Sequence, residues 1–169
     1  MGPFQPAQPD HHQHQPLHLH QPIGHTLDLP HYVTDTWSQR LHRIYPSEAA
    51  ALPIATWALA PLLQGADILW LMDNEAAVSA GIRGSSGLPE VDIMVQAAHL
   101  LWMRHDMRVW IEWIDTNSNP ADGLSRDGLD VWTQQQKWQL STVPNPPWSD
   151  DVSTPQSLYQ QLLQTLGGG

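Results

Sequence analysis

Two apolar runs decide the fold of this chain: ILWLM at residues 68–72 and VWIEWI at residues 109–114. Both have the length of a β-strand, and the first predicts a strand that is buried on both faces, as in a parallel sheet covered by helices. A carboxylate follows each run, Asp73 directly and Asp122 after a short polar turn. If the runs are neighbouring parallel strands, both carboxylates approach one edge of a sheet.

The residues between the two runs have helical spacing. Residues 74–82 predict a short helix that stops near residues 84–87, and Pro89 opens a longer helix as a first-turn proline. Side chains of one face repeat at three and four residues along this longer helix, at Val91, Met94, Ala98, Leu101, Trp102 and His105. After turn residues at 116–119, Pro120 opens a further short helix.

A helix is also predicted upstream of the first run, with Ser47 as its N-cap and its end before Gly65. Because Pro53 and Pro61 each remove a hydrogen bond inside it, we expect this helix to be kinked or broken. A short strand is expected around residues 37–41. The order strand, helix, helix, strand, helix indicates an α/β domain with a partly parallel sheet.

The composition bounds the class of protein. A length of 169 residues fits one domain with a modest core, and the absence of cysteine excludes disulfides and thiolate metal sites. Because we find no membrane-spanning run and no signal peptide, we expect an intracellular protein without a membrane partner. The net charge of −10, with seven Lys plus Arg, counts against strong nucleic-acid binding by this chain alone.

Three segments are predicted. Residues 1–33 are expected to be a disordered tail, because their His, Gln and Pro content gives no apolar periodicity. Seven of the ten histidines lie at positions 11, 12, 14, 18, 20, 25 and 31, and a loose transition-metal site is one hypothesis for them, a biased tail the other. We predict a folded domain at residues 34–130, then a polar linker at residues 131–169 with a last helix near residues 154–166.

Three carboxylates are candidates for a metal site: Glu48, Asp73 and Asp122. Carboxylates gathered at the carboxyl ends of strands repel one another unless cations offset their charge, and Mg²⁺ (or Mn²⁺) prefers oxygen ligands. Two such ions can activate a water and stabilise the leaving oxygen of a phosphodiester. The alternative is that these carboxylates have a structural role. An aspartate after a strand is often a turn residue or a helix cap, and a glutamate in the first turn of a helix interacts favourably with the helix dipole.

The strings LMDNEAA at residues 71–77 and WIDTNSNPADGLSR at residues 113–126 resemble the ribonuclease H domain of retroelement (retrotransposon-type) reverse transcriptases. Ile44 with the string SEAA at residues 47–50 is similar to the helix that bears that family's catalytic glutamate. Trp37 resembles a tryptophan that is frequent on the strand before this helix. The resemblance covers roughly residues 34–126, a little over half of the chain.

The resemblance implies a ribonuclease H-like mixed sheet of five strands flanked by helices. It implies a two-Mg²⁺ endonuclease that hydrolyses the RNA strand of RNA–DNA hybrids. Glu48, Asp73 and Asp122 would be catalytic metal ligands in such an enzyme, and Asn74 and Asn119 would be supporting or substrate-facing residues.

The chain departs from this family at the first catalytic aspartate, which the family carries on its first strand. Asp10 cannot take this role, because its surroundings, QPDHH, do not form a strand. Asp28 and Asp35 lie too close to Glu48 in the sequence to leave room for the strands that separate the two residues in the family. We therefore expect an N-terminally truncated domain with weak or no nuclease activity, whose partners are nucleic acid and the rest of a reverse transcriptase polyprotein. The alternative is a non-catalytic interaction module or nucleic-acid-binding relic, since nine tryptophans would leave apolar surface where a strand is missing.

Overall fold

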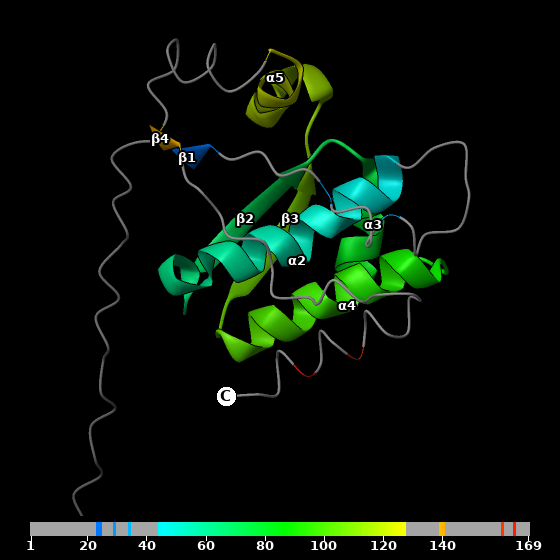
Figure 1. Ribbon diagram of the computed structural model, residues 1–169, viewed down its shortest axis with the longest axis vertical. Helices are drawn as coiled ribbons and strands as arrows, with labels where there is room; N and C mark the ends of the chain where they lie inside the picture. The colour runs from blue at the N-terminus through cyan, green and yellow to red at the C-terminus, as the bar shows by residue number, and fades with distance from the viewer. Residues whose placement is uncertain are drawn as a thin grey trace, which may run out of the picture.

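The computed structural model describes residues 23–24, 29, 34, 44–127, 139–140, 160 and 164. The main described range holds, in order, α2 (Ile44–Leu63), β2 (Asp67–Met72), α3 (Glu75–Arg83), α4 (Pro89–Arg104), β3 (Arg108–Trp113), the 3-10 helix η1 (Thr116–Ser118) and α5 (Pro120–Asp127). Figure 1 shows how these elements are arranged. No helix among the described residues combines the length and the apolar character that a membrane crossing requires.

Two further strands of two residues each, β1 (Ile23–Gly24) and β4 (Gln139–Leu140), pair with each other in parallel. β1 lies within the segment that the sequence predicts to be a disordered tail, and that expectation stays a prediction. The seven tail histidines, the strand expected around residues 37–41 and most of the helix expected at residues 154–166 lie outside the described residues. Gln160 and Gln164 are described, and both are helical and exposed.

β2 and β3 are parallel neighbours, as predicted, with Asp67 opposite Arg108 and Met72 opposite Trp113. α3 and α4 form the crossover connection between the two strands. The backbone N–H of Gly65 donates to the carbonyl of His105 at 2.9 Å, which aligns the two turns that lead into the strands. The described fold is thus of mixed helix and strand, with a two-stranded parallel sheet flanked by helices.

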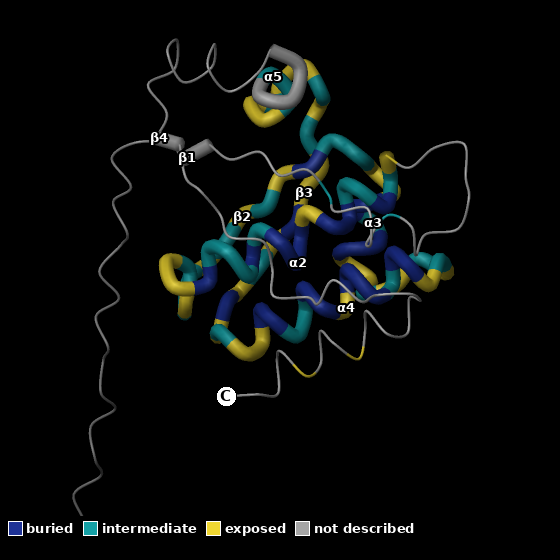
Figure 2. The backbone as a smooth tube through the Cα atoms, viewed as in Figure 1, coloured by how far each residue is buried: buried dark blue, intermediate teal, exposed yellow. Residues whose placement is uncertain are grey.

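Among the described residues, helices cover one face of the sheet formed by β2 and β3. That face contributes five residues that belong to the core or pack against it: Ile68, Trp70, Met72, Val109 and Ile111. On the opposite face Leu69, Leu71 and Trp110 are 63%, 44% and 69% exposed. The prediction that the first strand is buried on both faces is therefore wrong. The cause is that the buried residues of α2, α3 and α4 form a single core with one face of the sheet, as the buried positions in Figure 2 show.

α2 runs from Ile44 to Leu63 without interruption, although Pro53 and Pro61 lie inside it. The expected break is therefore absent, while the expected end before Gly65 is confirmed. Ser47 is not the N-cap, because the helix starts at Ile44 and accommodates Pro46 in its first turn, where no N–H is needed. Pro53 is fully buried among core residues, and this packing offsets the hydrogen bond that the proline removes.

α3 and α4 begin and end close to the predicted positions. The Oδ1 atom of Asn74 accepts a hydrogen bond from the N–H of Ala77 at 3.0 Å and caps α3. Gly84 ends this helix with a φ of 72°, a conformation that favours glycine. Pro89 is the first residue of α4. One residue of the predicted repeat, His105, lies beyond α4 as its C-cap and is only partly buried. The other residues of the repeat are buried: Val91, Met94, Ala98, Leu101 and Trp102.

α4 packs against α2, and one buried hydrogen bond joins the two helices. The Nε1 atom of Trp102 donates to the Oγ1 atom of Thr56 at 2.9 Å. The side chains are almost inaccessible, with Thr56 1% and Trp102 7% exposed. Because a buried indole N–H needs a partner, this bond fixes the register of α4 on α2.

Candidate active site at the carboxyl end of the sheet

Asp73 lies where β2 ends, beside the end of β3. The carbonyl of Met72 accepts a hydrogen bond from the N–H of Ile114 at 2.9 Å, so the two strands remain paired up to this point. The Asp73 side chain is half-buried. The parallel register therefore holds a carboxylate next to the loop that leaves β3.

The loop after β3 is built by side-chain caps. The Oδ1 atom of Asp115 accepts from the backbone N–H of Asn117 at 2.9 Å and starts η1. The Oδ1 atom of Asn119 accepts from the backbone N–H of Ala121 at 3.0 Å, and the N–H of Asp122 donates to the carbonyl of Asn119 at 3.1 Å. These short-range bonds turn the chain into α5 and set Asp122, half-buried, in its first turn.

Glu48 comes from a different part of the chain, near the start of α2, and is half-buried. Burial raises the pKa of the Glu48 carboxyl, and the negative charges of Asp73 and then Asp122 raise it further. Glu48 therefore lies within electrostatic reach of both Asp73 and Asp122. Figure 1 shows the start of α2, the end of β2 and α5 at the same end of the sheet.

The donor set suits a hard divalent cation, because three carboxylate groups supply oxygen ligands and excess negative charge. Within the part of the chain that the structure describes, however, no group of three or more His, Cys, Asp or Glu side chains is placed to hold a metal ion. The carboxylates thus repel one another without forming a finished coordination site. Binding of Mg²⁺ would require the side chains to move closer together.

Asn74 and Asn119 have structural contacts. The oxygen atom of each side chain accepts a hydrogen bond from a backbone N–H, as the cap of α3 and as the turn before α5. Each residue therefore holds its neighbouring aspartate, Asp73 or Asp122, in position. A contact of either amide group with substrate stays a prediction.

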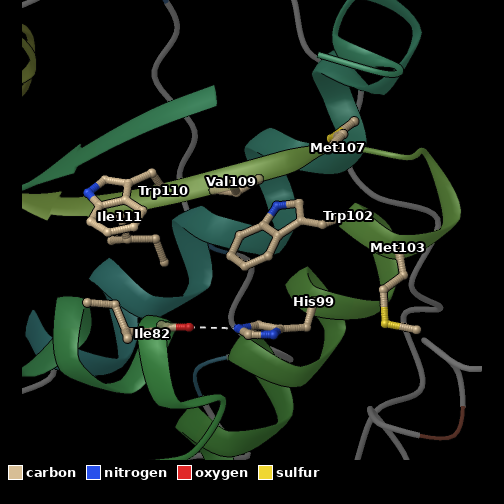
Figure 3. Close-up of a pocket in the computed structure, with 9 residues that line it drawn as sticks. Ile82, His99, Trp102, Met103, Met107, Val109, Trp110 and Ile111 are labelled. Atoms are coloured by element: carbon tan, nitrogen blue, oxygen red, sulfur yellow. Dashed lines mark hydrogen bonds between the residues drawn. The ribbon is translucent and has the colours of Figure 1, made fainter. Parts of the chain in front are cut away.

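A second concave feature lies away from the carboxylates, and no sequence pattern was taken to predict it. It is a cavity of about 420 Å³ between β3 and the last turns of α3 and α4, with Ile82, His99, Met103 and Trp110 among its walls (Figure 3). Ile82 and Met103 are apolar residues on otherwise solvated helix faces, with 60% and 75% of their surface exposed. Such misplaced apolar residues are the sequence signal that could have pointed to this cavity.

Comparison with known proteins gives no relative: no protein-family model, no curated protein and no solved structure matches this chain.

Proposed function

We propose that the chain contains a ribonuclease H-like domain related to that of retroelement reverse transcriptases, with weak or no remaining activity. The observation that carries the proposal is the convergence of Glu48, Asp73 and Asp122 at the carboxyl end of a parallel strand pair. The strand, helix, helix, strand, helix order of residues 67–127 supports the same assignment. The acidic strings around Asp73 and Asp122 add the sequence resemblance.

The three carboxylates would bind divalent metal ions, and Mg²⁺ or Mn²⁺ held there would supply water activation and charge neutralisation for phosphodiester hydrolysis. Helix caps and turns hold Asp73 and Asp122 at the end of the sheet. These two residues would therefore keep the metal site in a constant position relative to the core. Glu48, on α2, would approach from the side. Burial is the main cause of its raised pKa, and the negative charges of Asp73 and Asp122, which a cation would offset, raise it further.

The low activity that we expect has a cause in the set of ligands. The charges that raise the pKa of Glu48 come from two carboxylates, Asp73 and Asp122, and the family pattern adds a further aspartate on a first strand. With fewer ligands, the metal ions are held less tightly and the attacking water is positioned less well. The expected substrate remains the RNA strand of an RNA–DNA hybrid.

The test is cleavage of a labelled RNA–DNA hybrid by the purified full chain in Mg²⁺ or Mn²⁺. Asp73→Asn should abolish any cleavage, because it removes a ligand from the site. Asp67→Asn is the matched control, because Asp67 lies at the opposite end of the same strand in an exposed ion pair with Arg108 and should leave cleavage unchanged. Equal cleavage by both variants would show that another site, or a contaminant, cuts the RNA.

The second candidate function is a non-catalytic interaction module, and the uncovered sheet face favours it. Leu69, Leu71 and Trp110 form an exposed apolar surface of the kind that binds partners. The two functions differ in their need for metal. Mn²⁺ that broadens the NMR signals of Asp73 and Asp122 would support the nuclease. No such broadening in the folded protein at millimolar Mn²⁺ would support the interaction module.

A further inference from the structure

β3 has an outer edge whose main-chain groups point away from β2. The N–H of Arg108 points toward β2, because it donates to the carbonyl of Ala66 at 2.9 Å. Since this direction alternates along a strand, the N–H and C=O groups of Val109 and Ile111 point away from β2. Within residues 44–127, β2 is the strand with which β3 pairs. The main-chain groups of Val109 and Ile111 can therefore pair with a further strand.

The outer edge of β3 is also apolar. The cavity of about 420 Å³ lies along it, with Val109, Trp110 and Ile111 but no β2 residue in its walls (Figure 3). The cavity residues Ile82, Met103 and Trp110 are 60%, 75% and 69% exposed. Proteins protect an exposed strand edge with prolines, lysines or bulges, and the sequence of β3, RVWIEW, contains neither proline nor lysine. This edge therefore has the character of a contact surface between polypeptides.

The charges beside this edge balance one another, so they do not select a charged ligand. Arg108 is ion-paired with Asp67 and donates to the carbonyl of Gly65 at 3.0 Å. Glu112 carries the opposite charge farther along β3, where its Oε2 atom accepts from the Nε1 atom of Trp110 at 3.1 Å. The informative feature is the order of these charges, with the positive one at the start of the strand and the negative one near its end.

This order makes the sequence RVWIE at residues 108–112 complementary to itself. When two copies lie antiparallel with Trp110 at the centre, Arg108 lies opposite the partner's Glu112 and Val109 lies opposite the partner's Ile111. Val109 and Ile111 then form the hydrogen-bonded pairs, which agrees with the outward direction of their main-chain groups. Trp110 lies opposite the partner's Trp110 in a non-hydrogen-bonded pair, the type in which facing side chains are closest.

Other antiparallel registers lack this complementarity. A shift by two residues keeps the outward groups paired, but it places Glu112 opposite the partner's Trp110 or opposite the partner's Asp106. Asp106 has the same charge as Glu112, and like charges opposite each other destabilise a pair of strands. The outer edge of β2 lacks the symmetry as well, because a register centred on Leu69 places Asp67 opposite the partner's Leu71.

We propose that β3 binds β3 of a second copy of this chain, so that two strand pairs form one four-stranded sheet. The contact is isologous, with a twofold axis that passes between the two Trp110 residues at right angles to the sheet. Both cavities then lie on the same side of the joined sheet, where Ile82 and Met103 adjoin the partner. One contact thus covers the main-chain groups and the apolar rim of each copy.

A second copy suits this edge better than an unrelated strand does. Any extended segment can use the main-chain groups of Val109 and Ile111. Only a segment with a negative charge opposite Arg108 and a positive charge opposite Glu112 matches the side chains as well, and the chain itself supplies one. The net charge of −10 on each copy opposes association, but it is screened over about 8 Å at physiological ionic strength.

The first test is sedimentation velocity of the full chain at physiological ionic strength over a range of concentrations. We expect the mass to rise from that of one chain toward that of two. Glu112→Arg places arginines opposite each other at both ends of the contact and should weaken the dimer at least about tenfold. Glu75→Arg is the matched control, because it makes the same change of charge at an exposed position on α3 and should leave the dimer intact.

The second test fixes the register by disulfide formation, since the chain contains no cysteine. In the proposed register the Cα atoms of the two residues at position 110 lie about 4.5 Å apart, within the range that a disulfide bridges. Trp110→Cys should therefore give a covalent dimer on mild oxidation. Leu69→Cys is the matched control, because Leu69 is similarly exposed and lies beside Trp110 on β2. Three strand spacings, about 14 Å, separate the two residues at position 69, so this variant should remain a single chain.

The cysteine positions are exposed, so folding is retained, and circular dichroism verifies it. Three results would overturn the proposal: the mass of one chain at every concentration into the millimolar range, a Glu112→Arg variant that associates as well as wild type, or equal crosslinking at positions 69 and 110. Nuclease activity does not enter these measurements, because Glu48, Asp73 and Asp122 are not part of this edge.

Discussion

The bond between Trp102 and Thr56 allows a quantitative prediction, because it joins two helices inside the core. Thr56→Val keeps the shape of the side chain and removes the acceptor of the indole N–H. A buried donor without a partner costs about 1–3 kcal/mol. The methyl group that replaces the hydroxyl returns up to about 0.8 kcal/mol of apolar burial. We therefore expect the free energy of unfolding to fall by about 1–2 kcal/mol, which lowers Tm by about 2–8 °C for a chain of this size.

Thr56→Ser is the matched control. It keeps the acceptor and loses one buried methyl group, which costs about 0.8 kcal/mol. The reasoning thus predicts that valine, the more apolar residue, is more destabilising than serine at this position. Hydrophobicity alone predicts the reverse order.

The assay is urea unfolding at equilibrium, followed by tryptophan fluorescence and by circular dichroism. Trp102→Phe removes the donor, so the double variant with Thr56→Val should lose less stability than the sum of the two single variants, by about 0.5–3 kcal/mol. A valine variant as stable as wild type, or strictly additive effects, would refute the claim that this bond stabilises the packing of α4 on α2.

Two further predictions concern the candidate site. Asn74→Ala should lower the free energy of unfolding by about 1 kcal/mol through loss of the α3 cap, whereas Asn74→Ser should be nearly neutral in the same denaturation assay. With a metal chelator present at neutral pH, Glu48→Gln should raise the free energy of unfolding. The gain should be less than about 1 kcal/mol, because Glu48 is partly exposed to solvent, which screens its charge. Because the folded-state pKa of Glu48 is raised, wild type gains stability as pH falls through it, so the two proteins should converge in acid. A difference that grows as pH falls would contradict the sign of this shift, and Glu75→Gln, at an exposed carboxylate, is the control.

Local patterns predicted most of the secondary structure. The strand runs at residues 68–72 and 109–114, the first-turn proline of α4 and the glycine end of α3 all follow from short-range chemistry, and the structure has each of them. The start of α2 was misplaced, because Ser47 suits an N-cap but Pro46 also suits a first turn. The two signals conflict, and the longer helix forms because its residues 49–60 are largely buried.

The arrangement of the three candidate carboxylates could be predicted from the sequence only in part. Asp73 and Asp122 follow strands, so their approach to one sheet edge could be inferred from a parallel pair. The proximity of Glu48 depends on how α2 lies across the core, and no local pattern encodes it. The caps formed by Asn74 and Asn119 are local features. The burial and the negative charges that raise the pKa of Glu48 are properties of the folded arrangement.

The order and kind of the elements follow from local sequence, because hydrophobic period, prolines, glycines and caps act over a few residues. Tertiary structure alone decided which strand face is covered, how α2 passes through its prolines, and where the cavity beside β3 opens. The physical reason is that burial depends on residues distant in the chain. The apolar run ILWLM fits two covered faces, and only the placement of α2, α3 and α4 in one core leaves Leu69 and Leu71 exposed.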